Sequence, residues 1–274
     1  LHCPNALSLV AFHFVSSIDT AEAYGKGKAE TCLGDALKRL SYDRSDYVLT
    51  TKVFFGEHGP DSVLNQRGLS RKHVVEGLRK SLKRLQVDYV DVVFAHRSDP
   101  DVSIEEVVRA FNWVIEQGWA FYWGTSEWTA AEITEAWDVA DRLNLIGPCA
   151  EQPQYNLLHR SRVEDEYAPL YKRCNLGLTI WSPLAFGMLT GKYSGAKIPE
   201  DSRLIKEKRL ADSLTVEKAN AVDNLKPIAR RLGTSLAQLA LAWCLKNKQV
   251  SVVLMGASKL EQVRALRGEG RGQA

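Results

Sequence analysis

Short apolar runs alternate with amphipathic segments along this chain. Runs rich in β-branched and aromatic residues predict buried strands at 14–19, 47–54, 88–96, 119–126, 176–185 and 251–256, with a short one inside 148–156. Apolar residues at helical spacing predict helices at 70–85, 103–118, 129–144, 162–174, 215–232 and 235–246. A long polar loop is expected over 187–214. Strands that alternate with helices are typical of a parallel sheet built from repeated β–α units.

Several predicted helices begin with recognisable caps. Ser70 stands before one apolar period, and Ser103 and Thr129 are each followed three residues later by a glutamate. The second arrangement predicts a reciprocal capping box, in which the hydroxyl and the carboxylate each accept a backbone N–H. Gly118 closes the helix that Ser103 opens.

The number of units predicts the fold class. No Gly-x-Gly-x-x-Gly follows any predicted strand, so the fingerprint of an open dinucleotide-binding sheet is absent. A closed (β/α)8 barrel is usually about 250 residues long, close to the 274 residues here. Seven strands are recognised, which leaves the first one to be found before Asp19. No linker interrupts the pattern, so we expect a single domain over 1–274.

Composition excludes several classes of protein. The formal charge of +3 is too small to indicate nucleic-acid binding. Five scattered cysteines without a Cys-x-x-Cys pair predict neither disulfides nor a metal site, and favour a cytoplasmic protein. No apolar stretch reaches the ~20 residues of a membrane span. Residues 6–14 could pass for the apolar part of a signal peptide, but no basic flank precedes them and Asp19 follows closely.

Polar side chains end the otherwise apolar predicted strands. In chain order they are Asp19, Lys52, His96, Ser126, Gln152 and Trp181, and Tyr24 follows shortly after the first. Because the carboxyl ends of parallel barrel strands meet at one rim, we expect these side chains to lie near one another. Each of them taken alone could equally be a structural residue.

The ionisable members of this set suit proton donation to a carbonyl oxygen. An ammonium beside a phenol favours loss of the phenolic proton, so Lys52 could make Tyr24 a usable acid. Asp19 could pair with Lys52 and hold it, and His96 could orient and polarise the substrate oxygen. The residues alone leave open where a hydride would come from.

Six segments resemble a known family. They are "IDTAEAYGKGKAE", "TTKVF", "GLSRKHVVEGLRKSLKRLQVDYVDVVFAHRSDP", "YWGTSEW", "EQPQYN" and "WSPLAFGMLTGKY". Together they closely resemble the aldo-keto reductases, and among these the potassium-channel β-subunit branch with its fungal and bacterial relatives, over residues 18–263. The resemblance implies a (β/α)8 barrel and an NADPH-dependent reductase of aldehydes or ketones.

The resemblance also implies roles for individual residues. The catalytic four of the family fall on Asp19, Tyr24, Lys52 and His96, with Tyr24 as general acid. Channel β-subunits carry an asparagine at the histidine position, so His96 favours a working reductase over a purely regulatory subunit. Phe55 and Trp128 are expected as walls of the substrate pocket.

The cofactor residues implied by the resemblance lie mostly in the second half of the chain. Ser126 and Gln152 match the nicotinamide-amide site, and Trp181 matches the aromatic ring that stacks on the nicotinamide. The expected NADPH contacts after Trp181 are Ser182, Pro183, Leu184, Ala185, Lys192, Arg203, Gly256, Ser258 and Gln262, with Lys259 adding charge. Lys192 and Arg203 could instead be solvated loop charges, Ser258 a helix cap and Trp181 simple packing.

The chain departs from the family pattern in four places. Glu127 stands where relatives often carry Arg or Asn, and Ala265 with Leu266 replaces a Glu-Asn pair. Residues 1–14 do not resemble the family's amino-terminal hairpin and first strand, and residues 267–274 look like a tail. An unclosed barrel would expose strand edges, so weaker stability than in longer relatives is expected.

Three functions are therefore open. The first is an NADPH-dependent reductase of a small carbonyl compound. The second is a redox-sensing β-subunit of a voltage-gated potassium channel, and the third is a truncated aldo-keto reductase without activity. The substrate pocket of such a barrel is built by loops, so the sequence does not name the carbonyl compound. A homo-oligomer or a channel partner is compatible with either of the first two.

Overall fold

The structure is a computed structural model that describes residues 17–200, 202–207, 212–257 and 259–267. Over these residues the strands are β1 Ser17–Asp19, β2 Val48–Val53, β3 Val90–Ala95, β4 Ala120–Thr125, β5 Ala150–Glu151, β6 Gly177–Ile180 and β7 Val250–Val253. The helices are α1 Lys28–Leu40, α2 Arg71–Leu85, α3 Ile104–Glu116, α4 Ala130–Leu143, α5 Ala168–Arg173, α6 Arg203–Lys206, α7 Val216–Arg231, α8 Leu236–Lys246 and α9 Leu260–Arg267. Residues 1–14, Ser258 and residues 268–274 of the expected tail lie outside the described residues, so the expectations about them are not addressed by the structure.

The chain forms two compact units. The first contains the residues up to Gln152 together with Pro169–Gly177, and the second contains Pro153–Ala168 and the residues from Leu178 onward. Asp19, Tyr24, Lys52, His96, Ser126 and Gln152 belong to the first unit, and Trp181 with the later cofactor candidates belongs to the second.

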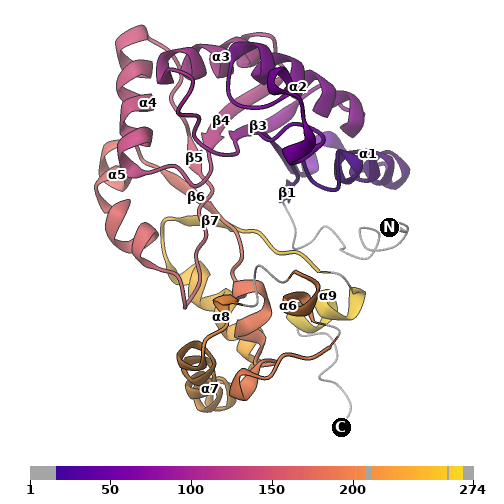
Figure 1. Cartoon of the computed structure of the whole chain (residues 1–274), viewed down its shortest axis with the longest axis vertical. Helices are drawn as coiled ribbons and strands as arrows, with labels where there is room; N and C mark the ends of the chain where they lie inside the picture. The colour runs from indigo at the N-terminus through magenta and orange to yellow at the C-terminus, as the bar shows by residue number, and fades with distance from the viewer. Residues whose placement is uncertain (1–16, 201, 208–211, 258, 268–274) are drawn as a thin grey trace. The chain divides into compact units, whose positions relative to one another are not determined.

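The first unit is built on parallel strands in chain order. β1 pairs with β2, β2 with β3, β3 with β4 and β4 with β5, each pair parallel. Helices α1 to α4 connect these strands, and Figure 1 shows them along the outside of the sheet. Parallel strands need such crossovers. Both faces of a parallel sheet are covered, and accordingly every residue of β2 after Val48 is buried, the polar ones included.

This five-stranded sheet is curled. Asp19 ends β1 and Gln152 follows β5, so four strand spacings separate them along the sheet. In a flat sheet that distance would be about 19 Å. The Gln152 Nε2 nevertheless donates to Asp19 Oδ1 at 3.1 Å. The carboxyl ends of β1 and β5 thus face each other across the inside of a curved sheet, as the barrel prediction requires.

Local signals explain most helix boundaries of the first unit. The Ser70 hydroxyl accepts the His73 N–H at the start of α2, and Thr129 with Glu132 forms the reciprocal capping box predicted for α4. The box predicted at Ser103 is only half formed. Its hydroxyl accepts the Glu106 N–H, but the Glu106 carboxylate accepts the backbone N–H of Arg71 instead. The first turn of α3 therefore also fixes the start of α2.

The sequence reading missed helix α1. Its buried residues Leu33, Ala36 and Leu37 follow a helical period, but the glycines before them obscure the start. Gly34 on this helix lies against α2 so closely that a Cβ would stand 2.5 Å from the Leu85 carbonyl oxygen. The close packing requires glycine at this position. A special backbone conformation is not the reason, because Gly34 has ordinary helical geometry.

The second unit has its own apolar core. β6 pairs in parallel with β7, and α7 and α8 follow in this unit. The segment expected as a polar loop buries Met188, Leu189, Tyr193 and Leu204 against the helices. The chain forms short 3-10 turns here, at Ala185–Thr190 and Ser194–Ala196. The predicted helix over 162–174 is a π-helical turn, Arg162–Glu166, followed by α5.

No helix in the described part of the chain is long and apolar enough to cross a membrane.

Candidate functional site

Three site candidates form one row at the carboxyl ends of the strands. The register pairs Ala95 with Thr125 and Thr125 with Glu151, so His96, Ser126 and Gln152 follow side by side. Their backbone N–H groups continue the sheet, since Ser126 donates to the Ala95 carbonyl and Gln152 to the Thr125 carbonyl. This rim is where functional groups of barrel enzymes are found.

Lys52 lies fully buried just below this row. Its side chain is 0% exposed, and its ammonium forms a short ion pair with the Asp19 carboxylate. The ammonium also donates to the Thr20 carbonyl oxygen at 2.7 Å. A buried charge is tolerated only when it is paired and hydrogen-bonded, and both conditions are met here. The ammonium is therefore held in one place at the end of β2.

Asp19 connects three strands through one carboxylate. Oδ2 accepts from Lys52, while Oδ1 accepts from Thr50 Oγ1 at 2.6 Å and from Gln152 Nε2 at 3.1 Å. Thr50 precedes Lys52 by two residues, so both side chains lie on the same face of β2. That period-two spacing in "LTTKV" could have indicated Thr50 from the sequence.

Tyr24 lies on the turn after β1, against both Lys52 and His96. Its ring centroid is 4.7 Å from the Lys52 ammonium and 5.7 Å from the His96 ring, in an edge-to-face arrangement. Tyr24 is 42% exposed, whereas its two neighbours are buried. The structure thus brings the four predicted catalytic residues together, with the phenol on the accessible side.

His96 is neutral in this setting. The residue is 7% exposed. Burial, together with the nearby positive charges of Lys52 and Arg97, lowers its pKa to about 2. Its Nδ1 is buried without a hydrogen-bond partner among the described residues. A neutral imidazole can donate one hydrogen bond without adding charge, and Nε2 is the nitrogen left to meet a substrate oxygen.

A buried glutamate that the sequence reading did not single out fixes the turn of Tyr24. Glu22 Oε1 accepts the backbone N–H groups of Phe54 at 2.7 Å and Gly56 at 2.8 Å, and the His73 Nε2–H at 3.0 Å. The Glu22 N–H in turn donates to the Lys52 carbonyl. The turn carrying the phenol is therefore tied to the segment after β2 and to helix α2.

The nicotinamide candidates of the first unit already have protein partners. Ser126 Oγ donates to the Gln152 carbonyl at 3.0 Å and accepts from Arg97 Nη1 at 3.3 Å. The Gln152 amide donates to Asp19, as described above. Arg97 follows His96 directly, and its place beside a polar strand end was the only sequence signal for it. Glu127 takes a left-handed backbone conformation, and its N–H donates to Glu151.

Of the two expected pocket walls, one lies at the site. The Phe55 ring is 5.0 Å from the His96 ring, edge to face. Trp128 is completely buried after β4 and contributes to the core. Of the two expected pocket walls, Phe55 is thus the one that contacts His96.

In the second unit, Trp181 leads into a strained loop. Trp181 forms a parallel bridge with Gln154, and its N–H donates to the Pro153 carbonyl. After it, Ser182, Ala185 and Phe186 all have positive φ, at 55°, 47° and 57°. Such conformations cost non-glycine residues roughly 1–3 kcal/mol each and gather at functional sites. The strain marks this loop as a candidate binding segment.

Backbone amides do not make this loop an anion site. The N–H groups of Ala185 and Gly187 donate to carbonyls within the loop, and that of Phe186 donates to the Ser182 hydroxyl. The charge comes from Lys192, whose ammonium lies over Gly187, where a Cβ would stand 2.9 Å from it. An exposed ammonium held over a side-chain-free residue fits a phosphate group. The residues present are thus compatible with a nicotinamide dinucleotide.

The remaining cofactor candidates are dispersed. Pro183 is buried and Leu184 packs partly against the core cluster of the second unit. Gly256 is exposed, and a Cβ there would meet nothing. Gln262 Oε1 accepts the Lys259 N–H at the start of α9, which is a capping contact. Arg203 begins α6, and its side chain lies outside what the structure describes.

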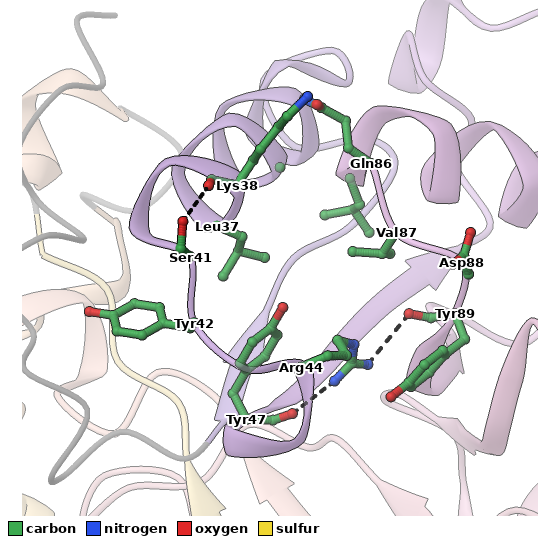
Figure 2. Close-up of a pocket in the computed structure, with 12 residues that line it drawn as sticks. Leu37, Lys38, Ser41, Tyr42, Arg44, Tyr47, Gln86, Val87, Asp88 and Tyr89 are labelled. Carbon is green, nitrogen blue, oxygen red and sulfur yellow. Dashed lines mark hydrogen bonds between the residues drawn. The ribbon is translucent and has the colours of Figure 1, made fainter.

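A pocket in the first unit lies away from these residues. It has a volume of about 410 Å³ and is lined by the last turns of α1 and α2 and by the residues that precede β2 and β3. Figure 2 shows Arg44 at its centre, between Tyr47 and Tyr89. Arg44 also pairs with Asp91 at 2.6 Å. The pocket thus lies at the amino ends of the strands, opposite the candidate site. Arg44 has a structural role there, because it connects the segment before β2 to β3 through Asp91.

Known proteins resemble this chain over most of its length. The family model described as "Aldo/keto reductase family" matches residues 5–268. A probable voltage-gated potassium channel subunit beta of Oryza sativa subsp. japonica is 57% identical over 252 residues, 91% of this chain and 76% of that protein. The corresponding protein of Arabidopsis thaliana is 54% identical over 255 residues, 92% of this chain and 76% of its own length.

A fungal relative and a solved structure agree with these matches. A putative voltage-gated potassium channel subunit beta of Schizosaccharomyces pombe is 50% identical over 267 residues, 96% of this chain and 77% of that protein. The crystal structure of a thermostable aldo-keto reductase in complex with the inhibitor epalrestat superposes with a TM-score of 0.70 at 25% identity, covering 98% of this chain and 80% of the other. The predicted α/β barrel class and the resemblance to the channel β-subunit branch are confirmed. The chain belongs to the aldo-keto reductase family, a family of oxidoreductases.

Proposed function

We propose that this protein reduces an aldehyde or ketone to an alcohol, with Tyr24 as the proton donor. The observation that carries the proposal is the Lys52 ammonium, buried, paired with Asp19 and 4.7 Å from the centre of the Tyr24 ring. A fixed cation beside a phenol stabilises the phenolate that remains after the proton is given away. Tyr24 is also the most exposed of the four side chains, which leaves it accessible to a substrate.

His96 orients the carbonyl in this proposal. Because its imidazole stays neutral, it donates a hydrogen bond to the substrate oxygen and leaves proton transfer to Tyr24. The ring centroids are 5.7 Å apart, and in this proposal both side chains donate to the same substrate oxygen. Two donors that converge on one oxygen stabilise the negative charge that develops there during reduction.

The hydride would come from NADPH, which the family generally binds. Ser126 and Gln152 would hold the carboxamide of the nicotinamide, Trp181 would cover its ring, and Lys192 would meet a phosphate. The support for this part is the strained loop after Trp181 and the ammonium over Gly187. Fluorescence titration of the full chain with NADPH and with NADH tests both the binding and the preference.

The proton donor is tested by Tyr24→Phe. The variant lacks only the hydroxyl, so turnover of 4-nitrobenzaldehyde should fall by roughly 10²- to 10⁴-fold while the NADPH dissociation constant stays within twofold. Tyr42→Phe is the matched control, since Tyr42 lies at the opposite strand ends, and its turnover should stay near that of the unchanged protein. A Tyr24→Phe variant with normal turnover would remove Tyr24 from this role.

A regulatory β-subunit of a potassium channel is the second candidate. It is favoured by the names of the plant and fungal relatives at 50–57% identity. Both functions could share one nucleotide site, and they differ in the partner. Purification of a tagged full-length chain from its own cells, followed by identification of bound membrane proteins, separates them. A channel that binds only the nucleotide-loaded chain would support the regulatory function.

A further inference from the structure

A guanidinium stands beside the four candidate catalytic residues. Arg97 Nη1 donates to the carbonyl oxygen of His96 and, at 3.3 Å, to Ser126 Oγ. The guanidinium carbon is 6.0 Å from the centroid of the Phe55 ring. These contacts hold Arg97 at the rim formed by the ends of β3 and β4, half-buried and within the first unit.

The charge of Arg97 is not compensated within the described residues. No carboxylate there forms an ion pair with it, and neither Nε nor Nη2 has an acceptor in that part of the chain. Other inward cations of the unit differ: Lys52 is paired with Asp19, and Arg84 with Glu30 at 2.7 Å. A half-buried cation without an anion creates a site of positive potential.

The unused edge of this guanidinium has the geometry of an anion receptor. Nε–H and one Nη2–H point in parallel, and a carboxylate accepts such a pair through both of its oxygens. Phe55 touches both His96 and Arg97, and His96 touches Tyr24. An anion on Arg97 would therefore lie within the length of one small molecule from the carbonyl position beside Tyr24.

We infer that Arg97 selects substrates that carry a carboxylate together with the reducible carbonyl, such as keto acids and aldehyde acids. This inference rests on the proposed reductase function and names its substrate class. The same receptor could meet a phosphate of the dinucleotide instead. Arg97 adjoins the groups proposed to act on the substrate oxygen, so the substrate carboxylate is favoured.

The experiment compares substrates that differ only in charge. 4-Carboxybenzaldehyde and its neutral methyl ester, methyl 4-formylbenzoate, are reduced by the full chain with NADPH, and kcat and KM are measured for both. The variants are Arg97→Gln, Arg97→Lys and the control Arg71→Gln, which removes an exposed arginine that lies over Trp113 on the helix surface. Binding of benzoate and of benzamide to the NADP⁺-saturated protein is measured in parallel by fluorescence quenching.

Arg97→Gln should raise KM for the carboxylate substrate about 10- to 100-fold, the loss expected for a hydrogen bond to a charged group. The ester should change by less than threefold, Arg97→Lys should retain part of the preference, and Arg71→Gln should match the unchanged protein. Weaker NADPH binding by Arg97→Gln, or an equal loss for both substrates, would overturn the inference and assign Arg97 to the cofactor or to Ser126.

The binding arm separates this inference from the proposed function. If no aldehyde is reduced but benzoate binds more tightly than benzamide and loses that advantage in Arg97→Gln, the reductase function fails and the anion site stands. If both aldehydes are reduced with equal efficiency and benzoate binds no better than benzamide, the reductase function stands and the anion site is wrong.

Discussion

The neutral state of His96 makes a prediction about folding stability. Its pKa falls from an ordinary 6.5 to about 2 on folding, because the ring is buried beside two cations. Between these values the unfolded chain binds a proton that the folded chain does not. Folding stability therefore rises with pH in this window and falls as the pH drops below 6.5. At pH 7.5 both states are neutral at this residue, and the effect vanishes.

The size follows from the linkage relation. Each pH unit below the unfolded pKa contributes about 1.4 kcal/mol, and at pH 5 the unfolded chain gains about 2 kcal/mol relative to pH 7.5. Replacing His96 with asparagine removes the titrating group and keeps a polar side chain of similar reach. The variant should therefore lose about 2 kcal/mol less than the unchanged protein over the same pH change.

Urea unfolding at pH 7.5, 6.5, 5.5 and 5.0, followed by tryptophan fluorescence, measures this difference. The comparison is between pH values for each protein, so any general effect of the substitution cancels. The other histidines are common to both chains and cancel as well. If the two proteins lose stability in parallel between pH 7.5 and 5, then His96 is protonated in the folded state. The account of it as a neutral hydrogen-bond donor would then be wrong.

Two further substitutions test the ion pair at the candidate site and the packing of α1 against α2. Lys52→Met leaves the Asp19 carboxylate, which is only 14% exposed, without its cation. Unfolding in urea should show a loss of roughly 3–5 kcal/mol, part of which the double variant Lys52→Met with Asp19→Asn restores. The absence of any restoration would show that the ion pair is not the cause. Gly34→Ala puts a methyl group 2.5 Å from the Leu85 carbonyl oxygen and should lower the free energy of unfolding by roughly 1–3 kcal/mol. The control Gly256→Ala, in open space, should change it by no more than about 0.5 kcal/mol. Equal losses in the two variants would contradict the packing argument.

Much of the first unit could be predicted because its signals are local. Helices α2 and α3 lie within two residues of their predicted ends, since a capping hydroxyl and an apolar period both mark them. Helix α1 was missed because two glycines precede it, and the half-formed cap at Ser103 reflects a competing partner on another helix. A tertiary contact thus replaced the local pattern at Ser103, and the glycines of the preceding turn hid it at α1.

The candidate site divides in the same way. Polar residues at strand ends were visible because strands and their ends have a sequence pattern, and the structure brings Asp19, Lys52 and His96 together. Glu22 and Arg97 were not predicted. The partners of Glu22 lie 32 to 51 residues away, and Arg97 is defined by a neighbouring strand. The strained backbone after Trp181 left no pattern either, because its residues are not those that favour left-handed conformations.

The carboxylate of Glu22 has a consequence for how this molecule can change. It anchors the turn of Tyr24 to three partners without touching the phenol. A related protein could keep all four catalytic candidates and still lose the hydrogen bonds of Glu22. The turn that carries Tyr24 would then become more mobile, although the reacting groups would be unchanged. The mobility of the proposed proton donor is thus determined by Glu22 and its identity by Tyr24. Selection can therefore change how firmly Tyr24 is held without changing Tyr24 itself.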